Sequence, residues 1–194
     1  MQDDTILSLL RASGALLEGH FLLSSGLHSD RYCQCARLLE DPAAGEQAAA
    51  LLAPALKPLG ATVVLAPALG GVLWGHEVAR ALGTRSVFAE RTDGRVFELR
   101  RGFALSATDR VLLAEDVVTT GKSVNEMTPL VEAAGARIVG VASVVDRSGG
   151  AYVAPHGAPF HHLARLAFQT WKAEECPLCA AGGKPIKPGS RANP

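Results

Sequence analysis

The chain has 194 residues, a length that fits one domain of ordinary size. Its 19 basic and 19 acidic side chains cancel to a formal net charge of zero, which argues against a partner held by bulk charge, such as nucleic acid or an anionic membrane. Hydrophobic residues make up 48% of the chain and charged residues 20%, a balance that excludes intrinsic disorder.

Helices and strands are predicted to alternate along the chain. Periodicity predicts a first helix over residues 4–17 that ends near Gly14, then a short apolar run over 19–25 and a strand or loop over 29–38. Further helices are expected at 43–57, 70–82 and 121–135, and strands at 62–66, 86–89, 110–114, 138–145 and 163–168. Such alternation predicts an α/β fold with a mostly parallel sheet, whose ligands bind beyond the carboxyl ends of the strands.

Two absences bear on the cellular setting. No apolar run is long enough for a membrane span, and the acidic start Met1–Asp4 lacks the basic region of a signal peptide. We therefore expect a cytoplasmic protein with no membrane partner and no nucleic-acid partner. Its four cysteines are then expected to be free thiols or metal ligands rather than disulfides.

The most informative stretch follows the strand predicted at 110–114. Glu115 and Asp116 come first, and a turn containing Thr119, Thr120 and Gly121 then leads into a helix. Backbone N–H groups at the start of a helix bind anions, and a glycine lets the backbone approach a phosphate closely. Because the two acids would repel a phosphate, they should face sugar hydroxyls or a phosphate-bound divalent cation. The combination predicts a site for a phosphorylated sugar.

Two simpler interpretations of this stretch were weighed. A strand that ends in a solvated turn, with threonine as the helix cap, explains a single residue better than it explains the whole string. A nucleotide-binding P-loop is excluded, because its first glycine would fall at position 116, which is Asp.

Residues 112–123 resemble the phosphoribosyl-pyrophosphate (PRPP) motif of type I phosphoribosyltransferases. Residues 21–29, 66–72 and 144–147 resemble, in family order, the N-terminal strand-turn, the pyrophosphate loop and the base-binding strand end of orotate phosphoribosyltransferases. The resemblance covers about residues 5–170. It implies the type I phosphoribosyltransferase fold, a mostly parallel central sheet flanked by helices with a small N-terminal hood. We expect this domain over residues 1–175, with the hood at about 1–40, and a Cys-, Gly- and Pro-rich tail over 176–194.

The resemblance assigns roles to individual residues. The ribose hydroxyls of PRPP are assigned to Glu115 and Asp116, and its 5′-phosphate to Thr119, Thr120, Gly121, Lys122 and Ser123. Val117 and Val118, which lie between these groups, are also assigned to PRPP binding. The pyrophosphate is assigned to Ala68, Leu69, Gly70 and Gly71. The orotate carboxylate is assigned to Arg147, and the rest of the base to Thr119, Tyr32, Cys33, Ser25 and Gly26. Without the family context, an ion pair between Arg147 and Asp146 explains this arginine better.

Residues 91–101 match the position of the mobile catalytic loop of the family, which reaches over the active site of the neighbouring subunit. Four arginines against two acids give this stretch a charge of +2. The resemblance therefore implies a homodimer with shared active sites, Mg²⁺ as cofactor, and the catalytic candidates Asp116, Glu115, Arg91 and Arg95. An ordinary solvated hairpin is the alternative for this loop.

Three departures from the family pattern stand out. Ser24 and Gly70 occupy positions where many members have lysine, and the loop at 91–101 carries arginine in place of lysine and histidine. Arginine outnumbers lysine 14 to 5 over the whole chain. Because arginine stays charged at any working pH, the loop is expected to supply charge and not protons.

Cys176 and Cys179 have the two-residue spacing of half a zinc site. Cys33 with Cys35, or His161 with His162, are the candidates for the other two ligands if the fold brings them close. The alternative is a plain turn that bears two cysteines.

The expected reaction is transfer of the phosphoribosyl group from PRPP to orotate, which gives orotidine 5′-monophosphate and pyrophosphate in pyrimidine synthesis. Two alternatives remain open. A phosphoribosyltransferase for a purine base would share residues 115–123 but would need no arginine at position 147. A non-catalytic regulator that senses PRPP and binds nucleic acid is disfavoured by the acidic start and the zero net charge.

Overall fold

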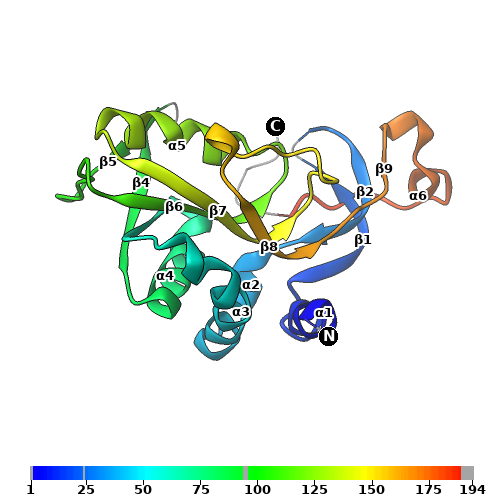
Figure 1. The fold of residues 1–194 in the computed structure, drawn as a ribbon. Coiled ribbons are helices and arrows are strands. Elements are labelled where there is room, and N and C mark those ends of the chain that lie inside the picture. The colour runs from blue at the N-terminus through cyan, green and yellow to red at the C-terminus, as the bar shows by residue number, and fades with distance from the viewer. Residues whose placement is uncertain (1, 24, 94–95, 189–194) are drawn as a thin grey trace.

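The computed structural model describes residues 2–23, 25–93 and 96–188, which form two sheets and their covering helices (Figure 1). The central sheet has the strand order β5-β4-β3-β6-β7-β8. Its strands are β3 (Val63–Pro67), β4 (Arg85–Thr92), β5 (Val96–Leu99), β6 (Arg110–Val118), β7 (Arg137–Asp146) and β8 (Phe160–Arg165). All neighbouring pairs are parallel except β4 and β5, which form an antiparallel hairpin.

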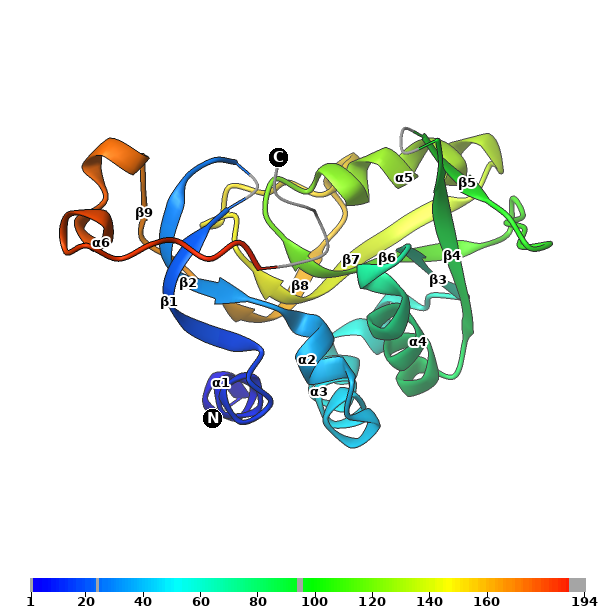
Figure 2. The same cartoon turned by 180° about the vertical axis from the view of Figure 1, so that it is seen from behind.

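A second, three-stranded sheet stands beside the central one and is called the hood sheet below. It consists of β1 (Leu16–Leu22), β2 (His28–Cys33) and β9 (Thr170–Trp171), paired antiparallel in the order β1-β2-β9. In Figure 2 the tail leaves β9, forms a short helix and returns along this sheet. There Ile186 pairs with Phe21 of β1. The C-terminal tail therefore packs along β1 of the hood sheet.

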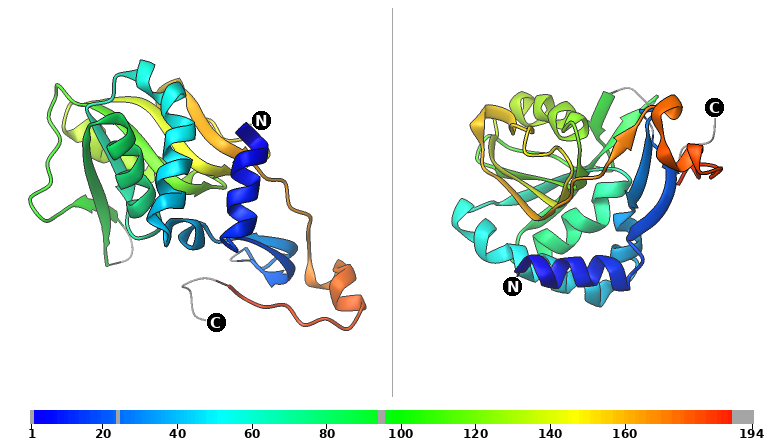
Figure 3. Two further views of the ribbon diagram at one scale, coloured as in Figure 1. Left: turned by 90° about the horizontal axis from the view of Figure 1, so that it is seen from below. Right: turned by 90° about the vertical axis from the view of Figure 1, so that its right-hand side faces the viewer.

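Helices cover both faces of the central sheet. The described helices are α1 (Gln2–Ala12), α2 (Cys35–Leu39), α3 (Pro42–Leu56), α4 (Gly70–Leu82), α5 (Lys122–Ala133) and α6 (Pro177–Ala180), of which α6 lies beside the hood sheet. Short 3-10 turns lie at Lys57–Leu59, Pro155–Gly157 and Ala173–Glu175. In Figures 1 and 3, α5 lies on one face of the sheet, and α1, α3 and α4 lie on the other. Among the described residues, no helix combines the length and the apolar character needed to cross a membrane.

The core has one apolar cluster on each side of the sheet. On the side of α3 and α4 it includes Trp74, which is fully buried and whose Nε1 donates to the carbonyl of Ala142 at 3.4 Å. On the side of α5 it includes Met127 and Phe97. Because both faces are covered, β3 and nearly all of β7 are buried along their length, as expected for a parallel sheet.

The predicted fold class is confirmed, and the differences lie mainly at the ends of elements. β6 continues to Val118, so that Glu115 and Asp116 belong to the strand and do not follow it. β8 begins at Phe160, three residues earlier than predicted, because it is an edge strand that accommodates the polar His161 and His162. Sequence patterns do not predict α2, β9 or α6, because these elements are too short for periodicity to develop.

Candidate active site

The carboxyl ends of β3, β6 and β7 lie at one edge of the sheet, because the three strands are parallel neighbours. The loops that follow them hold most of the predicted site residues. We describe these loops in turn, beginning with the acids of β6.

Glu115 and Asp116 differ in their surroundings although they are adjacent. Glu115 is buried, and its carboxylate accepts a hydrogen bond from the backbone N–H of Asp116 at 3.3 Å. Burial, and then the charge of Asp116, raise the pKa of Glu115 to about 9, against an opposing hydrogen bond from Ser123. Asp116 is less buried, and its Oδ1 accepts from the backbone N–H of Val117 at 2.8 Å. Glu115 therefore keeps its proton at neutral pH, and Asp116 presents the accessible carboxylate.

The turn between β6 and α5 depends on a glycine. Gly121 has a φ of 73°, and a Cβ at this position would lie 1.9 Å from Cε2 of Tyr152, so no other residue fits without a shift. Thr119 and Thr120 are exposed, and the backbone N–H of Lys122 points to the Thr120 hydroxyl at 3.4 Å. A concavity of about 60 Å³ is lined by Glu115 and residues 117–124. It opens at the N-terminus of a twelve-residue helix, where an anion finds N–H donors.

The loop after β3 meets the acids of β6. A Cβ at Gly70 would lie 3.4 Å from Oδ1 of Asp116. A Cβ at Gly71 would lie 2.7 Å from Cδ of Pro67 and 3.2 Å from the carbonyl oxygen of Ala114, which leaves no room for a side chain. The Ala68–Leu69 peptide bond is cis, and Leu69 is 88% exposed. The structure thus places the predicted pyrophosphate loop directly beside the predicted ribose-binding acid.

Arg147 follows β7 and is partly buried. Its guanidinium lies over the ring of Phe168, 4.4 Å from the ring centroid. Burial lowers the pKa of Arg147, and the neighbouring Cys33 and Tyr32 oppose that effect. Its backbone N–H donates to the carbonyl of Val118 at 2.7 Å, which ties the ends of β7 and β6 together.

Asp146 does not pair with Arg147, so the ion pair weighed from the sequence is wrong. The Asp146 carboxylate is buried and accepts from Nε of Arg165 at 2.8 Å and from the Ser148 hydroxyl at 2.6 Å. Burial alone would raise the pKa of Asp146, but the hydrogen bonds from Ser148 and Arg165 lower it. Within the described part of the chain, Arg147 has no ion-pair partner, and its charge is available to a ligand.

Tyr32 and Cys33 reach Arg147 from the hood sheet. Burial raises the pKa of Tyr32, while the charge of Arg147 lowers it and that of Asp116 raises it. Cys33 lies 3.7 Å from Cys35, sulfur to sulfur, and the Cys35 thiol approaches the carbonyl of Asp116 at 3.9 Å. The predicted base-binding and ribose-binding groups therefore share one neighbourhood.

Ser25 and Gly26 form the exposed turn between β1 and β2, where the N–H of Gly26 donates to the carbonyl of Leu23 at 2.9 Å. No described contact joins them to Arg147. Ser24, which stands where many relatives have lysine, lies outside the described residues.

The described residues of the stretch 91–101 lie at the end of β4, in β5 and in the turn after β5. The catalytic role of this stretch stays a prediction. Arg91 makes an ion pair with Glu126 of α5 and lies 4.1 Å from the ring centroid of Phe97. Arg101 pairs with Glu90 at 2.9 Å. Both positive charges are therefore matched within the chain. Arg95 lies outside the described residues.

Sequence reasoning missed two aromatic residues at this site. Phe168 supports the guanidinium of Arg147, and Tyr152 closes over Gly121. Neither belongs to a motif, and each reaches its position only through the tertiary fold, so no local signal could have identified it.

The ligand partners considered for Cys176 and Cys179 are also corrected. Cys33 and Cys35 lie beside Asp116, and His162 lies 3.7 Å from Asp146. The tail folds back onto the hood sheet, which takes its cysteines to two other histidines, His20 and His28.

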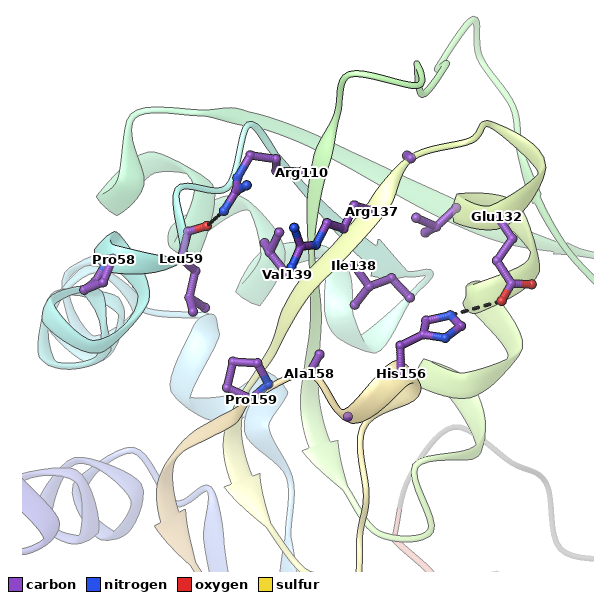
Figure 4. Close-up of a pocket in the computed structure, with 13 residues that line it drawn as sticks. Pro58, Leu59, Arg110, Glu132, Arg137, Ile138, Val139, His156, Ala158 and Pro159 are labelled. Atoms are coloured by element: carbon purple, nitrogen blue, oxygen red, sulfur yellow. Dashed lines mark hydrogen bonds and ion pairs between the residues drawn. The ribbon is translucent and has the colours of Figure 1, made fainter.

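A separate cavity of about 660 Å³ lies near the amino ends of β6 and β7 (Figure 4). Among the residues that line it, the Arg110 side chain donates to the carbonyl of Leu59 at 2.6 Å, and Nε2 of His156 lies 3.0 Å from the Glu132 carboxylate. This cavity lies at the amino ends of the strands, whereas Asp116 lies at their carboxyl ends, and it shares no residue with the site described above.

Comparison with known proteins gives a consistent result. Residues 36–158 match the family model described as the phosphoribosyl transferase domain. The orotate phosphoribosyltransferase of Novosphingobium aromaticivorans is 51% identical over 197 residues, which covers 100% of both chains. That of Sphingopyxis alaskensis is 50% identical over 195 residues and covers 99% of this chain and 98% of its own. The crystal structure of orotate phosphoribosyltransferase from Aeropyrum pernix is 26% identical, with a TM-score of 0.64, and covers 83% of this chain and 94% of that one.

Proposed function

The chain belongs to the phosphoribosyl transferase family, and we infer from this premise that it is an orotate phosphoribosyltransferase. The enzyme transfers the phosphoribosyl group of PRPP to orotate, with orotidine 5′-monophosphate and pyrophosphate as products. This is a pentosyl transfer of pyrimidine nucleotide synthesis.

The preference for orotate over a purine base is inferred from one residue, Arg147. Arg147 presents a partly buried guanidinium with no carboxylate partner in the described part of the chain, supported by Phe168 and adjacent to Tyr32. A guanidinium binds a carboxylate through two parallel hydrogen bonds, and orotate is a pyrimidine that bears one. A purine base offers no such group, so a purine phosphoribosyltransferase would leave this charge buried without a use.

We assign the other substrate to the loops around Asp116. The Asp116 carboxylate accepts hydrogen bonds from the ribose hydroxyls, and the protonated Glu115 is the neighbouring donor. Backbone N–H groups of residues 119–123 bind the 5′-phosphate, and those of residues 68–71 bind the pyrophosphate. Gly71 keeps the second loop free of a side chain, so that the backbone itself approaches the substrate. The orotate nitrogen is then held next to C1 of the ribose, and catalysis proceeds mainly by positioning.

The residues present fit a divalent cation that is held mostly by the substrate. Asp116 is an accessible carboxylate, and the absence of a side chain at Gly70 leaves the space beside it open to oxygen ligands. We propose Mg²⁺, which when bound neutralises the charge that develops on departing pyrophosphate.

We also propose that the enzyme acts in the cytoplasm as a homodimer with shared active sites. The proposed compartment is supported by the four cysteines, which form no disulfide in the structure. The β4–β5 hairpin lies at the end of the sheet that carries the site, and we assign the contact with the second subunit to it.

The test is an assay with PRPP and Mg²⁺ in which orotate, adenine, guanine and xanthine compete as acceptors. Orotate should be the preferred acceptor by orders of magnitude, and activity should fall when Mg²⁺ is removed by a chelator. Turnover of a purine with none of orotate would refute the assignment. A nucleic-acid complex that persists at physiological salt without any turnover would favour the regulator instead.

A further inference from the structure

Four metal-ligating side chains that the proposed reaction does not use meet at the hood sheet. His20 lies in β1 and His28 in β2, whereas Cys176 directly precedes α6 and Cys179 lies within it. Their ligand atoms all lie within 4.8 Å of one another. Cys176 and His28 are buried, and both cysteines are free. We propose that this group is a structural zinc site whose ligands are His20, His28, Cys176 and Cys179.

The distances agree with one tetrahedral ion. Zinc–sulfur bonds of about 2.3 Å and zinc–nitrogen bonds of about 2.0 Å give a sulfur-to-nitrogen edge of about 3.5 Å. Nε2 of His20 lies 3.5 Å from the sulfur of Cys176 and 3.7 Å from that of Cys179. Nδ1 of His28 lies 3.3 Å from the sulfur of Cys179. The two nitrogens are 2.9 Å apart, somewhat shorter than the edge of about 3.3 Å that the same bond lengths give.

The chemistry of the group favours zinc over the cations that prefer oxygen. Two thiolates and two imidazoles are a donor set that zinc takes in closed structural sites. Two thiolate charges also neutralise a dication, so the filled site can be buried without net charge. Without an ion, two imidazole nitrogens facing each other at 2.9 Å share a single proton, and the two thiols beside them are weak donors.

The backbone of the tail is shaped to present both sulfurs on one side. The N–H of Ala180 donates to the carbonyl of Cys176 at 3.1 Å, and the N–H of Gly182 donates to that of Cys179 at 2.8 Å. The turn closes with the N–H of Gly183 on the carbonyl of Leu178 at 3.0 Å. The two residues between Cys176 and Cys179 therefore form a compact turn, which brings both sulfur atoms close enough to bind one metal ion.

The position of the site suggests its purpose. After the turn, the N–H of Ile186 donates to the carbonyl of His20, and the N–H of Leu22 donates to the carbonyl of Ile186, both at 2.8 Å. The ion would thus fasten the tail to the β1–β2 hairpin whose β2 carries Tyr32 and Cys33. All four positions are filled by protein, so the ion has no open position for substrate and acts structurally.

The first experiment measures metal in the full-length chain, purified with a reductant and without added metal, by inductively coupled plasma mass spectrometry. We expect about one zinc per chain in the unchanged protein. Cys176→Ser and Cys179→Ser should lose most of it. Two matched controls, His76→Asn at an exposed position of α4 and Cys35→Ser outside the group, should retain it. Equal zinc in all variants, or a folded unchanged protein that contains and binds none, would overturn the proposal.

A second measurement on the unchanged protein covers the case in which the cysteine variants fail to fold. Replacement of zinc by Co²⁺ should give the intense visible bands of a tetrahedral ion and a thiolate-to-cobalt charge-transfer band. X-ray absorption of the zinc protein should give two sulfurs at about 2.3 Å and two nitrogens at about 2.0 Å. Oxygen-only ligation, or a disulfide between Cys176 and Cys179 under reducing conditions, would overturn the proposal.

The structural role has its own readout. Removal of zinc by a strong chelator should release the tail before the core unfolds, and trypsin should then cut after the exposed Lys172. The control is the same digest with zinc restored. Unchanged cleavage at Lys172 after complete removal of zinc would show that the ion does not hold the tail. None of these readouts uses turnover of orotate, so they can fail or succeed independently of the proposed reaction.

Discussion

Replacement of Arg147 by alanine gives the sharpest test of how the base is chosen. The guanidinium has no carboxylate partner in the described part of the chain, so the variant removes a ligand contact without breaking an ion pair within the protein. Truncation of one partner of a buried, hydrogen-bonded charge pair costs about 2–5 kcal/mol. Because Arg147 is only partly buried, we take about 3 kcal/mol, which corresponds to a fall of about 150-fold in kcat/KM for orotate.

The assay follows kcat and KM for each substrate in turn. The loss should fall mainly on the KM for orotate, and the KM for PRPP should change much less. Uracil, which is orotate without its carboxylate, provides a second arm. The unchanged enzyme should prefer orotate strongly, and the Arg147→Ala enzyme should lose most of that preference, since only the carboxylate contact has been removed.

Arg137→Ala is the matched control. Arg137 is an exposed arginine at the first position of β7, whereas Arg147 follows the last position of the same strand. Its removal should leave both KM values unchanged, and circular dichroism should show that both variants are folded. If Arg147→Ala raises the KM of orotate and PRPP equally, or leaves the preference for orotate over uracil intact, Arg147 does not bind the base carboxylate.

Three further predictions concern the loops around the acids. Asp116→Asn should lower kcat/KM for PRPP by about 10- to 100-fold, since a charged acceptor for the ribose hydroxyls is lost; unchanged kinetics with PRPP would refute that role. Gly121→Ala should destabilise the fold by about 2–4 kcal/mol in urea unfolding, because it combines a positive φ with a Cβ placed 1.9 Å from Tyr152. Adding Tyr152→Ala should recover only the steric part, and full recovery would contradict the backbone argument. Glu115→Gln tests how the free energy of unfolding depends on pH. Glu115 keeps its proton up to about pH 9 in the folded protein but loses it near pH 4.5 in the unfolded chain. The free energy of unfolding therefore falls as the pH rises between these values. The Glu115→Gln variant has no proton to lose at this position, so its free energy of unfolding relative to the unchanged protein should grow between about pH 5 and pH 9. A difference that stays constant over this range would refute the raised pKa of Glu115.

Prediction from the sequence succeeded where a single segment carries both the element and its chemistry. The stretch from Glu115 to Ser123 is strand, turn and helix start in one run, and its glycine is required at that place for two structural reasons. The glycine at position 71 is likewise explained by its nearest neighbours, Pro67 and Ala114. In such cases the residue types at a fixed local spacing determine both the backbone conformation and the ligand group that the segment can bind.

Prediction failed where a contact joins distant parts of the chain. Phe168 meets Arg147 only because β8 runs parallel to β7 and leads the chain to the carboxyl end of β7. No pattern in the sequence around Phe168 indicates this contact. The histidines beside the tail cysteines are separated from them by 151 and 156 residues, so the spacing of Cys176 and Cys179 shows half a site and conceals the other half. The alternative weighed for Arg147, an ion pair with Asp146, is wrong for the same reason, because Arg165 reaches Asp146 from another strand.

The arrangement of charge explains how a neutral chain can handle a highly anionic substrate. Two arginines of the β4–β5 hairpin are matched by Glu126 and Glu90, so they do not act as free positive charges in the isolated subunit. A glycine also stands at position 70, beside Asp116, where many relatives have lysine. Besides the exposed Lys122, backbone N–H donors at the start of α5 and in the loop at 68–71 can meet the phosphates, and these donors carry no formal charge and do not titrate. The proposed site therefore does not need a surplus of basic residues. Binding should then depend more on the two glycine-shaped loops keeping their form than on the number of basic side chains.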